Sequence, residues 1–288
     1  MTNPEQKQKA EAFRSLHSGS EVLLLPNAWE VGSARIVEEC DFPAIATTSA
    51  GIAFSHGYAD GQKIPKEDMF AAVARIARAV KVPVTADIES GYGNRPEDAA
   101  QTARAVIEAG AVGMNLEDAT GDSDRPLAEL SLQLEKIHAV RETTVSLNLP
   151  LVLNARTDVY LLQVGDPSKR YEETVRRLQA FRDAGADCVF VPGLRDASTI
   201  GRLVADLRCA VNILAVPGSP SVADLAKLGV VRVSLGSGPM RATLGFFRRL
   251  AKELKTAGTY TAMDGAPSYA EMNKLMNSSR RQSLRTEN

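Results

Sequence analysis

The chain is poor in cysteine and has no pair of cysteines close in sequence. Of its 288 residues only three are cysteines, Cys40, Cys188 and Cys209, and they are far apart with no Cys-x-x-Cys motif. This spacing argues against a zinc site and against a disulfide framework. It fits a protein of a reducing compartment, and we expect the cytoplasm.

The chain also lacks an excess of charge and a long hydrophobic run. Lys and Arg number 34 and Asp and Glu number 35, so no net charge attracts nucleic acid or an acidic membrane. Short cationic stretches at 248–250 and 280–285 are typical of a solvated helix face or a tail. No apolar run approaches the roughly 20 residues that span a bilayer, and the first residues do not form a signal peptide. We therefore expect a soluble protein that binds neither nucleic acid nor membrane.

What the chain does contain is a regular alternation of short apolar runs with longer amphipathic, alanine-rich segments. The runs have few polar alternations, which is typical of parallel strands buried on both faces. They begin at Val22, Pro43, Val82, Ala111, Pro150, Ala186, Val211 and Val230.

The segments between the runs have helical periodicity. In residues 65–80, Met69, Val73 and Ile76 recur at spacings of four and three. Two later segments resemble each other and end in Ala-Gly-Ala, where Gly110 and Gly185 suit a left-handed helix end before the next strand. The pattern is that of repeated strand–helix units.

Eight strand–helix units in roughly 240 residues predict an α/β fold of the (β/α)8 TIM-barrel type. A doubly wound open sheet is the alternative, but no Gly-x-Gly-x-x-Gly follows the first run and no second domain is apparent. We expect one barrel domain with an N-terminal helix over residues 1–271, and a helix or tail over residues 272–288.

In such a barrel the chemistry lies at the C-terminal ends of the strands. There the sequence places Asp87 and Glu89 after the third run, Glu117 after the fourth and Arg156 after the fifth. Residues two apart on an extended segment face the same way, so Asp87 and Glu89 can point at one ion. A divalent cation offsets the repulsion among three carboxylates, and oxygen ligands without His or Cys favour Mg²⁺ or Mn²⁺. Arg156 can then hold a substrate carboxylate through two hydrogen bonds; the alternative is a set of salt bridges at the rim.

Other residues expected near the same rim have more than one interpretation. Gly91 and Gly93 let the backbone turn tightly near a ligand, and Tyr92 between them either packs the turn or donates to substrate. His56 and Tyr58, in the long polar loop after the second run, are candidates to exchange a proton or are surface residues.

The Gly-rich segment at residues 235–241 follows the last run and has a different potential use. Its backbone N–H groups can form an anion nest at a helix N-terminus, which keeps a phosphate-binding barrel as an alternative.

Five motifs in order together resemble the isocitrate lyase/phosphoenolpyruvate mutase superfamily: Thr-Thr-Ser-Ala-Gly at 47–51, Tyr-Ala-Asp-Gly at 58–61, Asp-Ile-Glu-Ser-Gly-Tyr-Gly at 87–93, Leu-Glu-Asp at 116–118 and Ala-Arg-Thr-Asp at 155–158. The resemblance runs from about residue 24 to residue 244. It implies a barrel whose eighth helix is exchanged between the subunits of a dimer or tetramer. It also implies 2-oxo acid or 2-hydroxy-dicarboxylate substrates, and a bond made or broken beside an enolate-type oxyanion.

The resemblance assigns roles to individual residues. It implies that Mg²⁺ is bound by Asp87 and Glu89, with Glu117 and Asp60 near the same ion. It implies that the substrate is bound at Thr48, Ser49 and Ala50, and at Arg156, which stabilises the substrate oxygen. Gly91 and Tyr92 are further candidates for substrate binding because of their place in the turn after Glu89. Glu117 and Arg156 are thereby catalytic candidates, beside His56 and Tyr58.

One departure from the superfamily limits the choice of reaction. Its lyases carry a Lys-Lys/Arg-Cys-Gly-His loop after the strand 4 glutamate, whereas residues 117–129 contain no Cys, Lys or His. We predict a Mg²⁺-dependent lyase or decarboxylase that acts on a small 2-oxo or 2-hydroxy dicarboxylate. The alternatives are a phosphonopyruvate-type P–C hydrolase or mutase, and a barrel that binds 2-oxo acids without catalysis.

Overall fold

A computed structural model describes residues 4–19 and 21–277 of the chain. Within this part, the strands are short and all named strands pair in parallel. They are β1 Leu23–Leu25, β2 Asn27–Ala28, β3 Ile45–Thr47, β4 Val84–Ala86, β5 Gly113–Glu117, β6 Val152–Arg156, β7 Cys188–Phe190, β8 Val211–Leu214 and β9 Arg232–Ser234. All eight predicted runs contain strands, and the first strand continues past its run, residues 22–26, as the short strand β2.

The sheet closes on itself through β1 and β2, the two pieces of the first strand. Strand β1 pairs with β9 and strand β2 pairs with β3, so the sheet order β1-β9-β8-β7-β6-β5-β4-β3-β2 forms one barrel. Pro26 separates β1 from β2 and has no N–H to continue a ladder, but its carbonyl accepts from the N–H of Ala46 at 3.2 Å. The predicted (β/α)8 barrel is confirmed, with its first strand divided at a proline.

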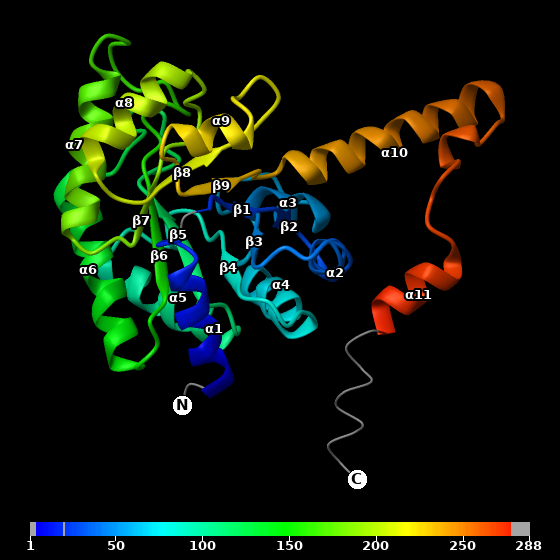
Figure 1. The fold of residues 1–288 in the computed structure, drawn as a ribbon, viewed down its shortest axis with the longest axis horizontal. Coiled ribbons are helices and arrows are strands. Elements are labelled where there is room, and N and C mark those ends of the chain that lie inside the picture. Colours follow the sequence, from blue (N-terminus) through cyan, green and yellow to red (C-terminus); the bar gives the residue numbers. More distant parts are fainter. Residues whose placement is uncertain (1–3, 20, 278–288) are drawn as a thin grey trace.

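The helices that follow the strands lie around the outside of the barrel (Figure 1). The helices of the described residues are α1 Pro4–Ser15, α2 Val31–Glu39, α3 Ser49–Ser55, α4 Lys66–Ala79, α5 Pro96–Glu108, α6 Leu130–Ser146, α7 Arg170–Asp183, α8 Ala197–Leu207, α9 Val222–Lys227, α10 Gly238–Ala257, α11 Tyr269–Asn277 and the 3-10 helix η1 Thr261–Met263. No helix in this part of the chain is long and apolar enough to cross a membrane.

Periodic apolar residues bind the helices to the sheet. In α5, Ala99, Ala103 and Val106 are fully buried at spacings of four and three, as an amphipathic helix against a sheet requires. Burial of a side chain the size of valine or isoleucine contributes about 1.5–3 kcal/mol, so Val106 and Ile107 of α5 each add an increment of this size. Gly110 and Gly185 have φ of +91° and +108°, which confirms the predicted left-handed turns from helix to strand.

Helix α1 covers the N-terminal end of the barrel, opposite to the strand ends that carry the chemistry. Phe13 of α1 is fully buried, and its ring lies edge-on to His17 at 4.9 Å between centroids. A Cβ on Gly113, at the start of β5, would lie 2.7 Å from the Phe13 ring. The absence of a side chain at residue 113 therefore lets Phe13 of α1 pack against this end of the barrel.

Helix α10 leaves the barrel instead of packing on it (Figure 1). Only Met240 and Leu250 of its 20 residues are buried, whereas Phe247 is 62% exposed. Helix α11 returns toward the barrel, where Arg35 of α2 donates to the carbonyl of Leu275 at 2.8 Å. Helix α11 spans the expected boundary between residues 271 and 272, and the rest of the predicted tail, residues 278–288, lies outside the described part.

Candidate active site

The carboxylates and the arginine predicted to act together meet at the C-terminal ends of three adjacent strands. Asp87 and Glu89 follow β4, while Glu117 and Arg156 are the last residues of β5 and β6. Glu117 and Arg156 are also direct partners in the register of these two strands. The barrel therefore brings all four side chains to one rim.

Neutral donors hold Asp87 in place. Its Oδ2 accepts hydrogen bonds from the N–H and the hydroxyl of Ser49 at 3.0 and 2.9 Å, and its Oδ1 accepts from Asn115 Nδ2 at 3.2 Å. The N–H of Asp87 donates to Thr47 Oγ1 at 2.9 Å. Asn154 supports this arrangement from below, because its Nδ2 donates to Asn115 Oδ1 at 2.8 Å. Asp87 is thus a buried carboxylate of fixed orientation.

Glu89 lies beside Asp87 in a less satisfied environment. Its φ of +56° is in the left-handed region, which a non-glycine residue occupies at a cost of order 1–3 kcal/mol. Its Oε2 accepts from the N–H of Gln62 at 2.6 Å, but the buried Oε1 has no hydrogen-bond partner among the described residues. Burial, together with repulsion from Asp60 and Asp87, raises the pKa of Glu89 to about 8.

Asp60 completes the acidic cluster from the loop after α3. The residue is exposed, yet partial burial of its carboxyl and the charge of Asp87 raise its pKa above the ordinary value. Within the part of the chain that the structure describes, no three His, Cys, Asp or Glu side chains surround a common point as a ready-made metal cage. Mg²⁺ does not require one, since it keeps several waters and binds through one or two carboxylates. Clustered carboxylates and the orphaned Glu89 oxygen therefore fit a hydrated Mg²⁺.

The turn after Glu89 is built for close approach. Gly91 has a φ of +94°, and a Cβ there would lie 3.1 Å from Leu116 Cδ1. Tyr92 has a φ of +55°, and its hydroxyl is buried without a hydrogen-bond partner in the described chain. Burial and the charge of Glu89 raise the pKa of this hydroxyl, so it stays protonated. Lys136 of α6 stabilises this turn, since its Nζ donates to the carbonyl of Gly93 at 2.8 Å.

Arg156 is already engaged by carboxylates of the protein. Its Nε and Nη2 donate to the two oxygens of Asp158 at 2.5 and 2.8 Å. Its Nη1 lies 2.7 Å from Glu117 Oε2, off the direction of an N–H bond, so this contact is an ion pair rather than an aligned hydrogen bond. The edge of the guanidinium expected to bind a substrate carboxylate is thus occupied by Asp158.

The charges around Arg156 shift its own pKa and that of Glu117. Burial alone would lower the pKa of Arg156, but Glu117 and Asp158 outweigh that effect and raise it. Burial raises the pKa of Glu117 well above its ordinary value, and Arg156 opposes this rise. The ring of Phe190 lies 5.6 Å from the guanidinium carbon and packs against its face. Arg156 is held as a fully charged cation.

Asp118 was not singled out by the sequence, although it follows Glu117 directly. It is 1% exposed and accepts hydrogen bonds from Thr157 Oγ1 and from the N–H of Asp158. Arg177 of α7 forms an ion pair with it at 3.1 Å. Burial raises the pKa of Asp118 to about 6, a rise opposed by the hydrogen bonds from Thr157 and Asp158 and by Arg177.

The remaining candidates are placed differently. Thr48 caps the N-terminus of α3, with its hydroxyl accepting from the N–H of Gly51 at 3.3 Å, and Ala50 is buried in the first turn. His56 closes the other end of α3, where its Nδ1 lies 2.9 Å from the Ile52 carbonyl oxygen. His56 is exposed, and Tyr58 is 39% exposed in the loop that carries Asp60. The proton-transfer roles of His56 and Tyr58 stay predictions.

The segment at 235–241 uses its backbone donors within the protein. The N–H groups of Leu235 and Gly236 donate to Asn27 Oδ1 at 2.7 and 2.9 Å. These two groups are therefore not free to form the anion nest on which the phosphate-binding alternative depended.

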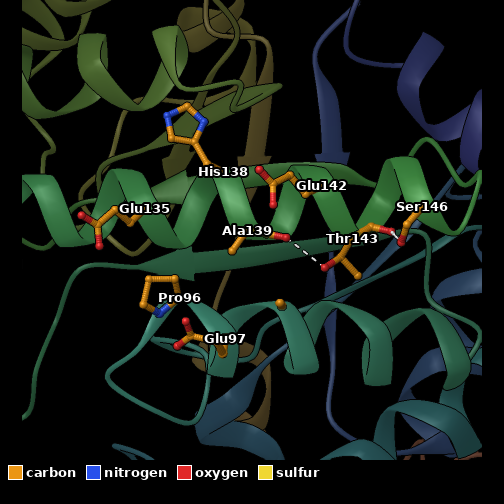
Figure 2. Close-up of a pocket in the computed structure, with 9 residues that line it drawn as sticks. Pro96, Glu97, Glu135, His138, Ala139, Glu142, Thr143 and Ser146 are labelled. Carbon is orange, nitrogen blue, oxygen red and sulfur yellow. Dashed lines mark hydrogen bonds between the residues drawn. The ribbon is translucent and has the colours of Figure 1, made fainter.

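Two hollows on the surface differ in their relation to the rim. A groove of about 560 Å³ lies between α5 and α6 on the outside of the barrel, and its lining residues include His138 and Glu142 of α6 and Pro96 of α5 (Figure 2). It contains none of the rim residues. A smaller cavity of about 280 Å³ is lined by Glu117, Asn94 and the loop that follows β5. This smaller cavity is the one that adjoins the candidate site.

Comparison with known proteins gives a consistent family. A sequence model described as phosphoenolpyruvate phosphomutase matches residues 13–255. An uncharacterised protein of Mycobacterium tuberculosis (strain ATCC 25618 / H37Rv) is 37% identical over 234 residues, covering 81% of this chain and 84% of that protein. The oxaloacetate decarboxylase of Ectopseudomonas mendocina (strain ymp) is 30% identical over 231 residues, covering 76% of this chain and 75% of the decarboxylase.

Solved structures agree with the sequence matches. A Burkholderia cenocepacia J2315 protein, provisionally assigned as a lyase or mutase, superposes with a TM-score of 0.89 at 39% identity, covering 94% of this chain and 96% of that one. The matched region contains the whole acidic rim and Arg156. The chain therefore belongs to the phosphoenolpyruvate phosphomutase family, within the isocitrate lyase/phosphoenolpyruvate mutase superfamily of lyases.

Proposed function

We propose that the protein is a Mg²⁺-dependent decarboxylase or C–C lyase for a small 2-oxo dicarboxylate of the oxaloacetate type. The observation that carries this proposal is the juxtaposition at one barrel rim of a carboxylate cluster, in which the buried Oε1 of Glu89 has no hydrogen-bond partner among the described residues, with a charged arginine held by Asp158. The oxaloacetate decarboxylase among its relatives supports the same class of substrate.

The metal would be held by Asp87 and Glu89, with Asp60 and Glu117 close to it. When bound, Mg²⁺ (or Mn²⁺) supplies Lewis-acid stabilisation of a negatively charged substrate oxygen. Asp87 is the best-positioned ligand because its hydrogen bonds to Ser49 and Asn115 fix it. The orphaned Oε1 of Glu89 is a second oxygen available to the hydrated ion.

Arg156 would stabilise the oxyanion from the opposite side. Cleavage of the C3–C4 bond of oxaloacetate releases CO₂ and leaves the electron pair as the enolate of pyruvate. The charge that develops on the enolate oxygen is greater in the transition state than in the ground state, so a fixed guanidinium lowers the barrier. Asp158 prevents Arg156 from swinging away, and the N–H atoms of Nη1 and Nη2 that do not face Asp158 remain to meet the substrate.

The loop at residues 118–129 favours decarboxylation over isocitrate-type cleavage. It contains no Cys, His or Lys that could protonate a leaving carbanion. Loss of CO₂ from a 2-oxo dicarboxylate needs neither a base nor an acid in the bond-breaking step. The resulting enolate takes one proton afterwards to give pyruvate, and the protonated hydroxyl of Tyr92 or water can supply it.

The test is pyruvate release from oxaloacetate with Mg²⁺ and with EDTA. Because Mg²⁺ also accelerates spontaneous decarboxylation, an Asp87→Asn variant at the same metal concentration is the blank. A Mg²⁺-dependent rate well above that blank is expected. Equal rates for both proteins across oxaloacetate and substituted malates would reject a decarboxylase or C–C lyase.

A phosphonate reaction is the second candidate, favoured by the phosphoenolpyruvate phosphomutase family match itself. Phosphate or phosphoenolpyruvate formation from phosphonopyruvate, measured beside oxaloacetate, separates the two. A barrel that binds 2-oxo acids without turnover would instead bind oxalate with Mg²⁺ by calorimetry and convert none of these substrates.

We further propose that α10 is exchanged between subunits of a dimer or tetramer. Its exposed apolar residues Leu244, Phe246 and Phe247 have no cover in the single chain. Light scattering after gel filtration is expected to show an oligomer that Phe247→Glu weakens. A monomeric wild-type protein would contradict the exchange.

A further inference from the structure

The buried carboxylate of Asp118 has no part in the reaction described above, although it lies directly behind the rim. We propose that Asp118, through its pairing with Arg177, is a positioning residue that sets the Arg156–Asp158 pair and couples it to the loop at residues 118–128. The expected change in kcat rests on the proposed function, whereas the expected changes in hydrogen exchange do not.

Asp118 binds residues 157–158, the segment that contains Asp158, the hydrogen-bond partner of Arg156. Its Oδ1 accepts from the N–H of Asp158 at 2.9 Å, and its Oδ2 accepts from Thr157 Oγ1 at 2.7 Å. Asp158 in turn receives both hydrogen bonds from the edge of the Arg156 guanidinium. A displacement of Asp118 therefore moves Asp158 first and Arg156 next.

Asp118 is also the first residue of the loop at 118–128, and it holds the two ends of this loop together. Its carbonyl accepts from the N–H of Ala128 at 2.8 Å, and Ala119 bridges Leu127 one residue further along. Arg177 Nη1 joins the two ends again, donating to Asp118 Oδ2 at 3.1 Å and to the Ala128 carbonyl at 3.0 Å. The base of the loop is thus fastened by the backbone of Asp118 and, through Arg177, by the same carboxylate that holds the 157–158 segment.

The burial of this pair points to positioning rather than to stability. The side chains of Asp118 and Arg177 are 0% and 9% exposed. The free-energy cost of desolvating two such charges offsets most of their favourable electrostatic attraction, so a buried pair is weak evidence for stability. What it does provide is a fixed geometry, because breaking it leaves a buried charge unpaired. Glu173 adds to that geometry by holding Arg177 Nε at 2.7 Å.

The coupling has a consequence for the substrate. The loop at 118–128 lines the cavity of about 280 Å³ that adjoins Glu117. A substrate group that pushes this loop outward also pulls on Asp118, and through it on Arg156. Fit in the cavity is therefore transmitted to the cation that stabilises the oxyanion.

The experiment compares Asp118→Asn with Asp183→Asn, which breaks an exposed arginine pair on α7. Asp118→Asn is expected to lower kcat on oxaloacetate by about 10- to 100-fold, because small misplacement of a catalytic group has effects of this size. Its Kd for Mg²⁺ by calorimetry should stay within about twofold, since the residues around Asp87 are untouched. The control should match wild type in both measurements.

Two further readouts distinguish positioning from general damage. Combined with Arg156→Lys, Asp118→Asn should add much less than its single effect, because the two act in series. Hydrogen exchange should become faster at Asp158 and in residues 119–128 of Asp118→Asn, with the strands unchanged. Multiplicative effects, or unchanged exchange at these sites, would overturn the proposal.

Exchange is measurable without turnover, so a wild-type protein inactive on oxaloacetate would count against the proposed function alone. Should Asp118→Asn not fold, Thr157→Val removes one of the hydrogen bonds to Asp118 and leaves the ion pair intact. It should then show the same pattern at smaller size, with exchange rising at Asp158. Wild-type exchange in Thr157→Val would contradict the proposal.

Discussion

The two halves of the rim differ in how their charges are satisfied. In the acidic half, formed by Asp60, Asp87 and Glu89, the hydrogen bonds come from neutral groups, and the charge of Asp87 helps burial to raise the pKa values of Asp60 and Glu89. In the arginine half, formed by Glu117, Asp118, Arg156, Asp158 and Arg177, each carboxylate has a guanidinium partner. One half is arranged to receive a cation, and the other already contains its cations.

This difference explains why the two halves should respond differently to mutation. On the proposed function, a residue of the acidic half would act through a bound ion, so its loss should weaken Mg²⁺ binding and activity together. A residue of the arginine half would act on the substrate oxyanion, so its loss should lower kcat at nearly constant metal affinity. Substitutions in the two halves should therefore separate metal affinity from kcat.

Asp87→Asn should have the largest effect, because it removes charge from the best-positioned carboxylate and preserves its shape. We expect Mg²⁺ binding to be lost in calorimetry and turnover to fall by about 1000-fold, the rate equivalent of several kcal/mol of metal stabilisation. Circular dichroism should show a folded protein. Full activity of this variant would place the metal elsewhere.

Arg156→Lys should lower kcat by about 100-fold and leave the Kd for Mg²⁺ nearly unchanged. Lysine keeps the charge but loses the planar fork that meets Asp158 and the substrate oxygen. Steady-state kinetics beside metal titration would check this. A parallel loss of metal affinity would mean that the two halves are not separate.

Glu89→Gln should change how the stability of the metal-free protein depends on pH. The folded-state pKa of about 8 lies above the ordinary value of 4.5, so folding favours the protonated carboxyl. This contribution is fully present below pH 4.5 and is lost as the pH rises through 8, by up to a few kcal/mol. Urea unfolding in EDTA should show wild type losing stability from pH 5 to pH 8, while Glu89→Gln loses less. Equal slopes would indicate that Glu89 titrates normally.

Asn115→Ala should have the smallest effect, because it touches the metal only through Asp87. Loss of the hydrogen bond to Asp87 Oδ1 should weaken Mg²⁺ binding about tenfold, as is common for residues behind a ligand. Activity at saturating Mg²⁺ should largely recover. If saturating metal does not restore it, Asn115 acts on the arginine half or on the fold.

Periodicity and strand-end logic were sufficient for the barrel and for the convergence of Asp87, Glu89, Glu117 and Arg156. Parallel strands read as apolar runs on both faces, and the residue that ends such a run lies at the rim whatever the loops do. Pro26, which divides the first strand, lies within the predicted run. That Pro26 divides the strand follows only from the pairing of β1 with β9 and of β2 with β3.

The sequence was less informative where a side chain had several possible partners. Arg156 was expected to present its fork to the substrate, but Asp158, two residues further along the same segment, occupies that edge. The i, i+2 spacing that the sequence analysis used for Asp87 and Glu89 also separates Arg156 from Asp158 and could have indicated this contact, although Glu89 itself, with a φ of +56°, does not continue an extended strand. Asp118 gave no such signal, because its partners come from the segment after β6 and from α7, far away in sequence.

The barrel, its family and the chemical nature of the rim follow from the amino-acid order, because they depend on local pattern and on residue type at strand ends. Which carboxylates are paired and which are not depends on tertiary packing. That outcome depends on distances between residues such as Asp118 and Arg177, which a chain brings within 3.1 Å only when its helices pack around the closed sheet.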